Sequence, residues 1–118
     1  MVKFLIIGDS CVDKFIYGEC DRICPEAPVP VFNPIRKTEN DGMAGNVKAN
    51  IESLDTSCDI ITNTQMIIKT RYVDNKTNQM LLRVDEDDYC DPINSQQLKY
   101  INDNKFDAVV ISDYCKGF

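Results

Sequence analysis

The fold is decided by the stretch Phe4-Leu5-Ile6-Ile7-Gly8-Asp9-Ser10, a short apolar run that ends in glycine and polar residues. Branched and aromatic residues followed by polar residues are typical of a buried strand. In an open α/β sheet, ligands bind beyond the carboxyl ends of the strands, where Gly8, Asp9 and the nearby Asp13 would lie. These carboxylates are therefore candidate ligand groups. The alternative is that Asp9 and Ser10 only cap the following turn.

A second apolar run, Asp107-Ala108-Val109-Val110-Ile111-Ser112-Asp113-Tyr114, has the same design. Two buried parallel strands that each end in serine and aspartate would place Asp9, Asp13 and Asp113 along one edge of one sheet. This pattern predicts an α/β fold. The alternative for Asp113 is a strand end that is capped by its own side chains.

A glycine-containing loop is predicted at Asn40-Asp41-Gly42-Met43-Ala44-Gly45-Asn46. Val47, Ile51 and Leu54 follow at helical spacing, so the loop would open a helix whose first N–H groups are free to meet an anion. The two glycines would otherwise serve only the turn and close packing of the helix.

The middle of the chain predicts strands that lie away from the central sheet. Prolines alternate with apolar residues in Ala27–Phe32, so this segment is an edge strand or a projecting flap. Met66–Val73 and Gln79–Val84 flank a turn-rich linker and predict an antiparallel hairpin. Its alternating cations Lys69, Arg71 and Arg83 would bind a phosphate or remain solvated on an exposed face.

Three further segments complete the coarse prediction. Cys11–Cys20 mixes apolar with polar residues, and Gly18 within it is interpreted as a turn. A modest helix follows Asp91-Pro92, with Leu98 and Ile101 on one face. The acidic run Asp85-Glu86-Asp87-Asp88 lacks the glycine and glutamate that a calcium loop requires, so we interpret it as a solvated loop.

Length and composition indicate one domain with an ordinary core. The chain has 118 residues, 43% of them hydrophobic, and a formal charge of −6. The negative charge argues against non-specific nucleic-acid binding. The sequence has no apolar run of membrane-spanning length and no signal-peptide pattern, so we expect a cytoplasmic protein without membrane partners.

The cysteine and histidine counts restrict the chemistry. The six cysteines have no secretory signal beside them and are expected to be reduced thiols. Their spacing does not offer a zinc site, and the chain has no histidine, so no metal ligands are predicted. Catalysis by Ser-His or Cys-His pairs is excluded, which leaves carboxylates, lysines and tyrosines.

Four phrases together resemble a known family. They are Gly8-Asp9-x-x-x-Asp13; Ile23-x-Pro25-Glu26-Ala27-Pro28-Val29-Pro30-Val31; the pair Lys69-Thr70-Arg71 and Asn78-Gln79-x-Leu81-Leu82-Arg83; and Ser112-Asp113-Tyr114-x-Lys116-Gly117. They resemble the N-terminal part of the ribokinase-like (PfkB) sugar kinases. Among these, the chain is most similar to the heptose 7-phosphate kinases of lipopolysaccharide-core precursor synthesis.

The resemblance implies a fold and a set of site residues. Residues 1–118 would form a partial PfkB-type domain, with a ribokinase-like (Rossmann-type) parallel sheet and a small antiparallel β lid that often pairs with a second subunit. The implied substrate is a sugar phosphate. Asp13 and Asn46 would bind sugar hydroxyls, Gly42 would allow backbone approach, Asp113 would be a second polar wall, and Lys69 and Arg71 would face the phosphate. Gly42 and Asn46 match the family's Gly-Gly-x-x-x-Asn phrase at the start of a helix, and Met43 stands where the family has the second glycine.

The sequence also departs from the family. Only about a dozen residues join Leu54 to Lys69, where the kinases have a further β-α-β passage. None of the five glycines forms the Gly-Ala-Gly-Asp motif that supplies the family's catalytic base and anion hole. The family implies ATP and Mg²⁺, but we expect their binding half to be absent, and we predict no catalytic residue.

The departures leave open whether the chain is an enzyme. By resemblance it would be the substrate half of a phosphotransferase. The alternatives are a non-catalytic binding module that forms a homodimer through its lid strands, one half of a split kinase that needs a separate ATP-binding chain, and an inactive relic.

Overall fold

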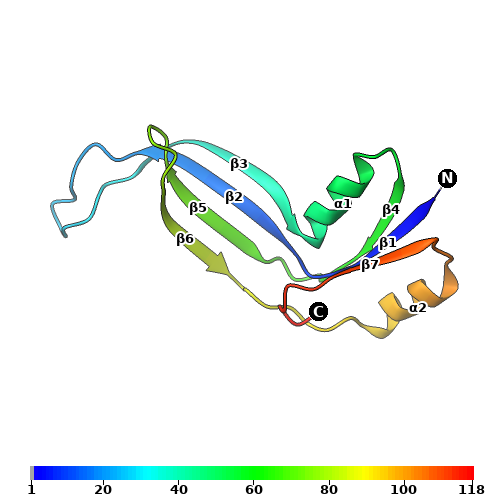
Figure 1. Ribbon diagram of the computed structural model, residues 1–118. Coiled ribbons are helices and arrows are strands. Elements are labelled where there is room, and N and C mark those ends of the chain that lie inside the picture. The colour runs from blue at the N-terminus through cyan, green and yellow to red at the C-terminus, as the bar shows by residue number, and fades with distance from the viewer. Residues whose placement is uncertain (1) are drawn as a thin grey trace.

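The protein folds into two sheets that meet end to end (Figure 1). The computed structural model describes residues 2–118. The elements in chain order are β1 (Lys3–Gly8), β2 (Ser10–Glu19), β3 (Asn33–Met43), α1 (Ala44–Glu52), β4 (Ser57–Ile61), β5 (Ile68–Asp74), β6 (Met80–Glu86), α2 (Ser95–Asp103) and β7 (Ala108–Ser112).

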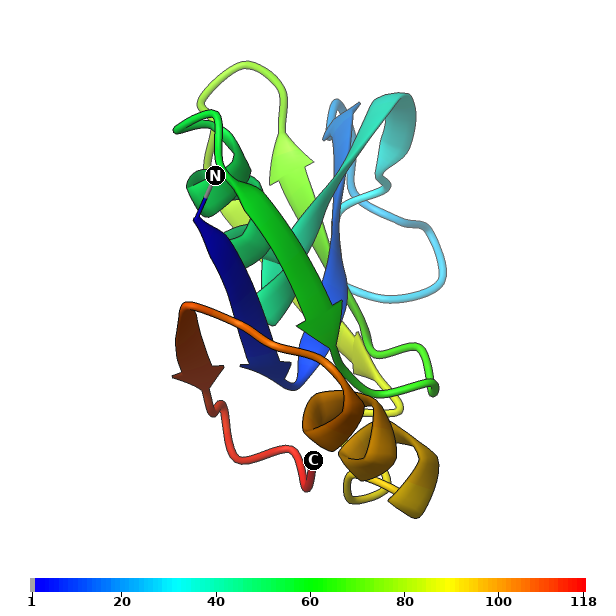
Figure 2. The ribbon, with the colours of Figure 1, turned by 90° about the vertical axis from the view of Figure 1, so that its right-hand side faces the viewer.

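The core sheet has the strand order β4-β1-β7, and both pairings are parallel. Side chains alternate between its two faces. Ile6 packs with Ala44 and Cys58 on the face that α1 covers, while α2 lies on the opposite side (Figures 1 and 2). The predicted α/β class and the two predicted parallel strands are confirmed.

The sequence predicts that the second strand, β7 (Ala108–Ser112), is buried, and this is correct for only one of its faces. β7 is an edge strand of the core sheet. Val109 is 50% exposed and Ile111 is 74% exposed, because no layer covers the outer face of this strand among residues 2–118 (Figure 2). An apolar run identifies a strand, but it does not show how many of its faces are covered.

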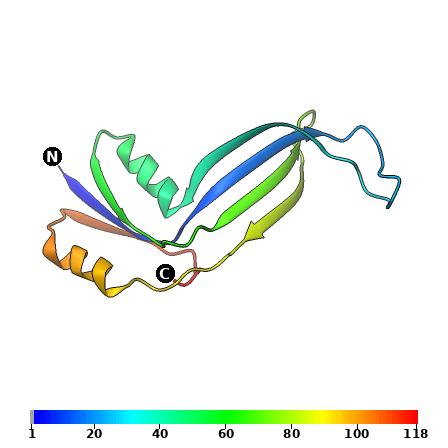
Figure 3. The same ribbon diagram turned by 180° about the vertical axis from the view of Figure 1, so that it is seen from behind.

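The lid sheet has the order β3-β2-β5-β6 and projects away from the core sheet (Figure 3). The predicted hairpin is confirmed as the antiparallel pair β5–β6. The lid is not wholly antiparallel, however, because β2 pairs with β5 in parallel and with β3 antiparallel. It is therefore a mixed sheet.

Three local predictions are wrong. Gly18 is not a turn but lies within β2, where a side chain would overlap the ring of Phe32. Asn40–Met43 is not a loop but the end of β3, from which the chain enters α1 directly. Leu54 lies beyond the end of α1 and is exposed.

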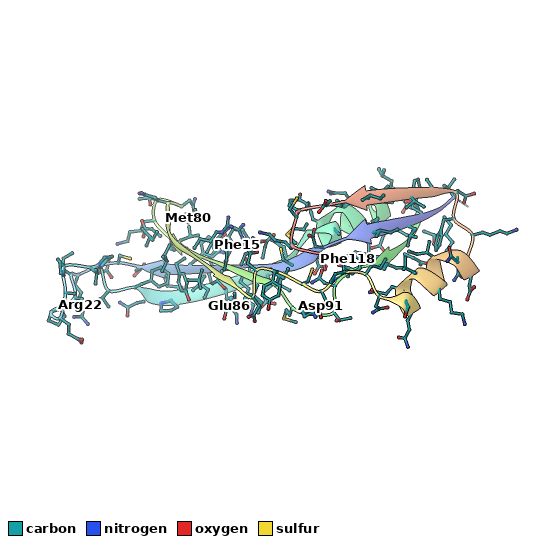
Figure 4. All side chains as sticks on the ribbon, turned by 90° about the horizontal axis from the view of Figure 1, so that it is seen from below. Phe15, Arg22, Met80, Glu86, Asp91 and Phe118 are labelled. Atoms are coloured by element: carbon teal, nitrogen blue, oxygen red, sulfur yellow. The ribbon has the colours of Figure 1, made fainter. Side chains whose placement is uncertain are left out.

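The proline-rich segment forms the projecting flap that the sequence allowed. It contains a single bridge, between Ile23 and Pro30, instead of a strand. Figure 4 shows Arg22 at the far tip of the lid and Phe118 beside the core sheet. The molecule measures 60 × 30 × 16 Å.

A single residue, Asp9, joins β1 of the core sheet to β2 of the lid sheet. A second apolar cluster packs around this junction and contains Cys11, Met43, Ile67 and Cys90, with Phe118 against it. The junction is therefore built from chain segments that are distant in sequence.

Candidate functional site

A cavity of about 840 Å³ lies where the lid sheet meets α1 and the segment after β7. We call it the junction cavity. It is lined by Cys11, Asp13, Phe15, Glu39, Asn40, Asp41, Gly42, Met43, Asn46, Ala49, Lys69, Arg71, Arg83, Tyr114 and Lys116. Five of the six predicted site residues are in this set, and Asp113 is not.

Asp13 and Arg71 form the central ion pair of the cavity. Arg71 lies opposite Phe15 in the parallel pairing of β2 with β5, two places beyond the partner of Asp13. Both side chains are thus on one face of the lid sheet. The Arg71 Nη1 donates to Asp13 Oδ1 at 2.9 Å, and the guanidinium lies 5.1 Å from the centre of the Phe15 ring. The carboxylate is fixed but still faces the cavity.

Gly42 provides the room that Asp13 needs. It lies opposite Cys11 in the β2–β3 pairing, and a side chain at Gly42 would overlap both the Asp13 carboxylate and the Cys11 sulfur. Burial, with a contribution from Asp13, raises the pKa of the Cys11 thiol to about 11. Cys11 is therefore a neutral packing group instead of a nucleophile.

Met43 and Asn46 lie where the chain enters α1. Met43 has φ 54° and ψ −125°, a conformation that favours glycine, although its side chain is buried in the junction cluster. The N–H of Ala44 donates to the carbonyl of Asp9 at 3.0 Å. Asn46, in the first turn of α1, is exposed and lines the cavity.

Three cations besides Arg71 line the junction cavity, and each is paired with a carboxylate. Lys69 Nζ lies 3.2 Å from Asp88 Oδ1 and 3.6 Å from Asp85 Oδ2. Lys116 Nζ lies 2.9 Å from Asp88 Oδ2. Arg83 donates twice to Asp85, from Nε at 2.8 Å and from Nη2 at 2.7 Å.

These pairings correct the prediction for the acidic run. Glu86 and Asp87 are exposed as expected, but Asp85 and Asp88 are partners of the cavity cations. Arg83, followed by Lys69, lowers the pKa of Asp85 to about 2. Lys116 and Lys69 lower the pKa of Asp88 as well. Both groups are carboxylates at neutral pH.

Asp9 holds one wall of the cavity in place. It is 1% exposed and accepts hydrogen bonds from the backbone N–H groups of Tyr114 at 2.9 Å and Lys116 at 2.8 Å. Asp9 is thus a capping residue, as one alternative held, but it caps the distant segment after β7 instead of the turn that follows it. Through this contact Asp9 positions Lys116, which the sequence named only as part of a motif.

Asp113 points to a different place. Its carboxylate accepts from the N–H of Cys115 at 2.8 Å and borders a separate cavity of about 490 Å³ beside the ends of β1 and β7. Asp9 and Asp113 do follow neighbouring strands, as predicted, but Asp13 lies inside the lid sheet.

Other features bear on metals and membranes. The six cysteines are free thiols. Residues 2–118 contain no group of three histidine, cysteine or acidic side chains arranged to hold a metal ion. Neither helix in the described part of the chain has the length and apolar character needed to cross a bilayer.

Comparison with known proteins identifies sequence relatives. No family model matches the chain. It is 33% identical over 150 positions to the bifunctional protein HldE of Helicobacter pylori strain J99, covering 99% of this chain and 32% of that protein. It is 34% identical over 139 positions to the HldE of Campylobacter jejuni strain RM1221, covering 98% of this chain and 30% of that protein. The chain thus spans about a third of the length of these relatives.

The alignments contain more positions than this chain has residues, so the relatives carry internal residues without a counterpart here. A solved structure confirms the fold. The putative phosphofructokinase from Staphylococcus aureus superposes with a TM-score of 0.59 at 11% identity, covering 93% of this chain and 43% of that chain. The chain resembles the ribokinase-like (PfkB) sugar kinases, and the curated relatives that it matches in sequence are HldE proteins.

Proposed function

We propose that residues 1–118 are the substrate-binding and lid portion of an ATP-dependent carbohydrate kinase that phosphorylates a hydroxyl of a sugar phosphate. The resemblance to heptose 7-phosphate kinases makes heptose 7-phosphate the first candidate substrate. The observation that carries the proposal is the division of the junction cavity into an acidic wall and a basic wall.

The acidic wall suits sugar hydroxyls. It contains Asp13, Glu39 and Asp41 from β2 and β3, with Asn46 on the neighbouring helix. Carboxylate oxygens accept hydrogen bonds from hydroxyls, while an amide both donates and accepts. We assign Asp13 and Asn46 to the sugar, and Gly42 to the space that lets Asp13 reach it.

The basic wall suits a phosphate. Lys69 and Arg71 come from β5, Arg83 comes from β6, and Lys116 follows β7. Four cations on one wall are notable in a chain whose formal charge is −6. Ammonium and guanidinium groups bind phosphate oxygens through charge-assisted hydrogen bonds. We assign Lys69 and Arg71 to the substrate phosphate, as the sequence predicted, and leave Asp113 outside the cavity as a residue of the loop.

Phosphoryl transfer needs further parts. Positioning of ATP and stabilisation of the transferred group account for nearly all of its catalysis. The described residues offer neither a glycine-rich anion hole nor an acidic cluster for Mg²⁺. We therefore propose that the ATP and Mg²⁺ sites lie outside residues 2–118, for example on a complementary chain. A phosphorylated sugar substrate favours a cytoplasmic location.

The proposal is tested by isothermal calorimetry of the folded chain with heptose 7-phosphate and, separately, with ATP. We expect the sugar phosphate to bind and ATP not to bind. Asp13→Asn and Asn46→Ala should each weaken sugar-phosphate binding about tenfold, which corresponds to one charge-assisted hydrogen bond.

Matched controls are available in the chain. Asp21→Asn changes an exposed carboxylate near the flap, and Asn50→Ala changes an exposed amide one turn further along α1. Both should bind like the wild type. Unchanged affinity in the two cavity variants, with the fold intact, would show that the site assignment is wrong.

A second candidate function is dimerisation through the lid strands. All seven residues of β6 are exposed, including Met80, Leu81, Leu82 and Val84. An unpaired edge strand with exposed apolar side chains is a common site of strand pairing. A homodimer is compatible with sugar binding, but it would also form in a module that binds no sugar.

A further inference from the structure

The carboxylate of Asp88 lies between two ammonium groups of the basic wall. Its Oδ1 is 3.2 Å from Lys69 Nζ, and its Oδ2 is 2.9 Å from Lys116 Nζ. One anionic group thus bridges two cations through two oxygens. A phosphate monoester can make the same two contacts, because its terminal oxygens have similar spacing and also accept charge-assisted hydrogen bonds.

The charges of the basic wall favour an exchange of anions. Lys69, Arg71, Arg83 and Lys116 are paired with three carboxylates, from Asp13, Asp85 and Asp88. These seven groups leave one positive charge. A phosphate ester carries about −1.5 to −2 at pH 7. Removing Asp88 from the group would leave two positive charges, which match the phosphate.

Lys69 and Asp88 differ in how easily each can lose its partner. Lys69 is only 7% exposed, so its ammonium must keep an anionic partner. The Asp88 side chain is 36% exposed and lies in a loop beyond the end of β6, next to the exposed Tyr89. It can rotate into water without breaking a strand, and Lys69 then keeps the carboxylate of Asp85, 3.6 Å away, as an anionic partner. Asp88 is therefore the group that can leave.

We propose that Asp88 is an internal anion that takes the place of a phosphate between Lys69 and Lys116, two cations that line the junction cavity, and is displaced when a phosphate-bearing ligand binds to them. The identity of the natural ligand rests on the proposed function, but the exchange itself does not. Asp88 would then set the affinity for the phosphate end of a ligand and would leave the sugar end unaffected.

Inorganic phosphate is the probe, titrated into the folded chain and followed through backbone amide NMR signals. We expect Asp88→Asn to bind phosphate about fivefold more tightly than the wild type, because the competing ion pair is lost. Affinity should also fall more steeply with added salt. Asp88→Glu, which restores the carboxylate, should return affinity toward the wild-type value.

Asp87→Asn is the matched control, because it removes the same charge from the neighbouring exposed residue. It should leave phosphate affinity unchanged. The proposal is overturned if Asp88→Asn binds phosphate no more tightly than the wild type, or if Asp87→Asn gives the same gain.

The wild-type chain provides a measurement that does not depend on the folding of a variant. Phosphate should shift the amide signals of Asp88 and Lys116 with one common midpoint, and an unmoved Asp88 signal would overturn the exchange. Heptose 7-phosphate is titrated in parallel. Tighter phosphate binding by Asp88→Asn, with no heptose 7-phosphate binding by any variant, would refute the proposed function and leave the anion exchange supported.

Discussion

A substitution at Gly42 should affect ligand binding more than the stability of the fold. A methyl group there would overlap the Asp13 carboxylate and the Cys11 sulfur, which are side-chain ends and can move aside. Gly42→Ala should therefore lower the free energy of unfolding by only about 1 kcal/mol. It should weaken sugar-phosphate binding about tenfold, because Asp13 loses its position beside Arg71.

Gly45→Ala is the control for this change, since it adds the same methyl group in the first turn of α1, 3.0 Å from the Cβ of Asp41. Calorimetry measures the sugar-phosphate affinity of both variants, and thermal unfolding measures their stability. A Gly42→Ala protein that binds like Gly45→Ala would contradict the role we give Gly42.

Asp85 makes the stability of the protein sensitive to acid. Its pKa is about 2 in the folded chain, because Arg83 and Lys69 favour its ionised form, and about 3.9 in an unfolded chain. The stabilisation is complete above pH 4 and is lost as the pH falls toward 2. Because Arg83 is 42% exposed, solvent screens the pair and the loss of stability should be small. Urea unfolding at pH 5, 4 and 3 should show a shallower pH dependence for Asp85→Asn than for Asp87→Asn.

The site residues differ in how far the sequence could predict them. Asp13, Gly42, Asn46, Lys69 and Arg71 belong to family phrases, and each lines the junction cavity. The pairing of Asp88 with Lys69 and Lys116 was missed, because it joins residues 19 and 28 positions apart through the packing of the two sheets. No local pattern reports such a contact. The acidic residues of β3 were missed because that strand was not predicted.

The segment after β7 depends on Asp9 for its position. Asp9→Asn keeps only one of the two acceptor oxygens and directs an amide N–H at a backbone donor. The variant should lose about 1–3 kcal/mol of unfolding free energy. Hydrogen exchange should accelerate at the amides of Tyr114 and Lys116, while those of β4 stay protected. Asp113→Asn is the control, because it alters a carboxylate of the same segment whose partner, Cys115, is exposed. It should leave hydrogen exchange at the amides of Tyr114 and Lys116 unchanged.

Strands were predictable where apolar residues form a run or flank a turn-rich linker, whether or not the structure buries them. β1 and β7 are short apolar runs, and β5–β6 has a turn-rich linker, so all four were found. β3 reads Asn-Pro-Ile-Arg-Lys-Thr-Glu-Asn-Asp-Gly-Met and is exposed except at its last two residues. It pairs along nearly the whole of β2 through backbone groups. With no buried face, there is no alternation in the sequence to reveal it.

The shape of the whole chain suggests a partner for the lid. Its radius of gyration is 18.6 Å, whereas a compact chain of about this size has about 13 Å. If the lid strands pair in a homodimer, sedimentation velocity should show concentration-dependent association that Leu82→Glu weakens at least tenfold, because the charge would be buried at the interface. Leu54→Glu changes an exposed leucine just beyond α1 and should associate like the wild type. A wild-type chain that remains monomeric at all concentrations would exclude this function.

The lid sheet meets the core sheet at one end, where β1 passes to β2 through Asp9 and β3 runs directly into α1. The ten residues of β2 extend about 33 Å from that point, and Asp13 lies about 13 Å along them. A rotation of about 10° at Asp9 would carry the far end of β2 about 6 Å, but Asp13 only about 2 Å. Asp13 thus lies close to the end at which the two sheets meet, where a large displacement of the lid's tip changes its position little.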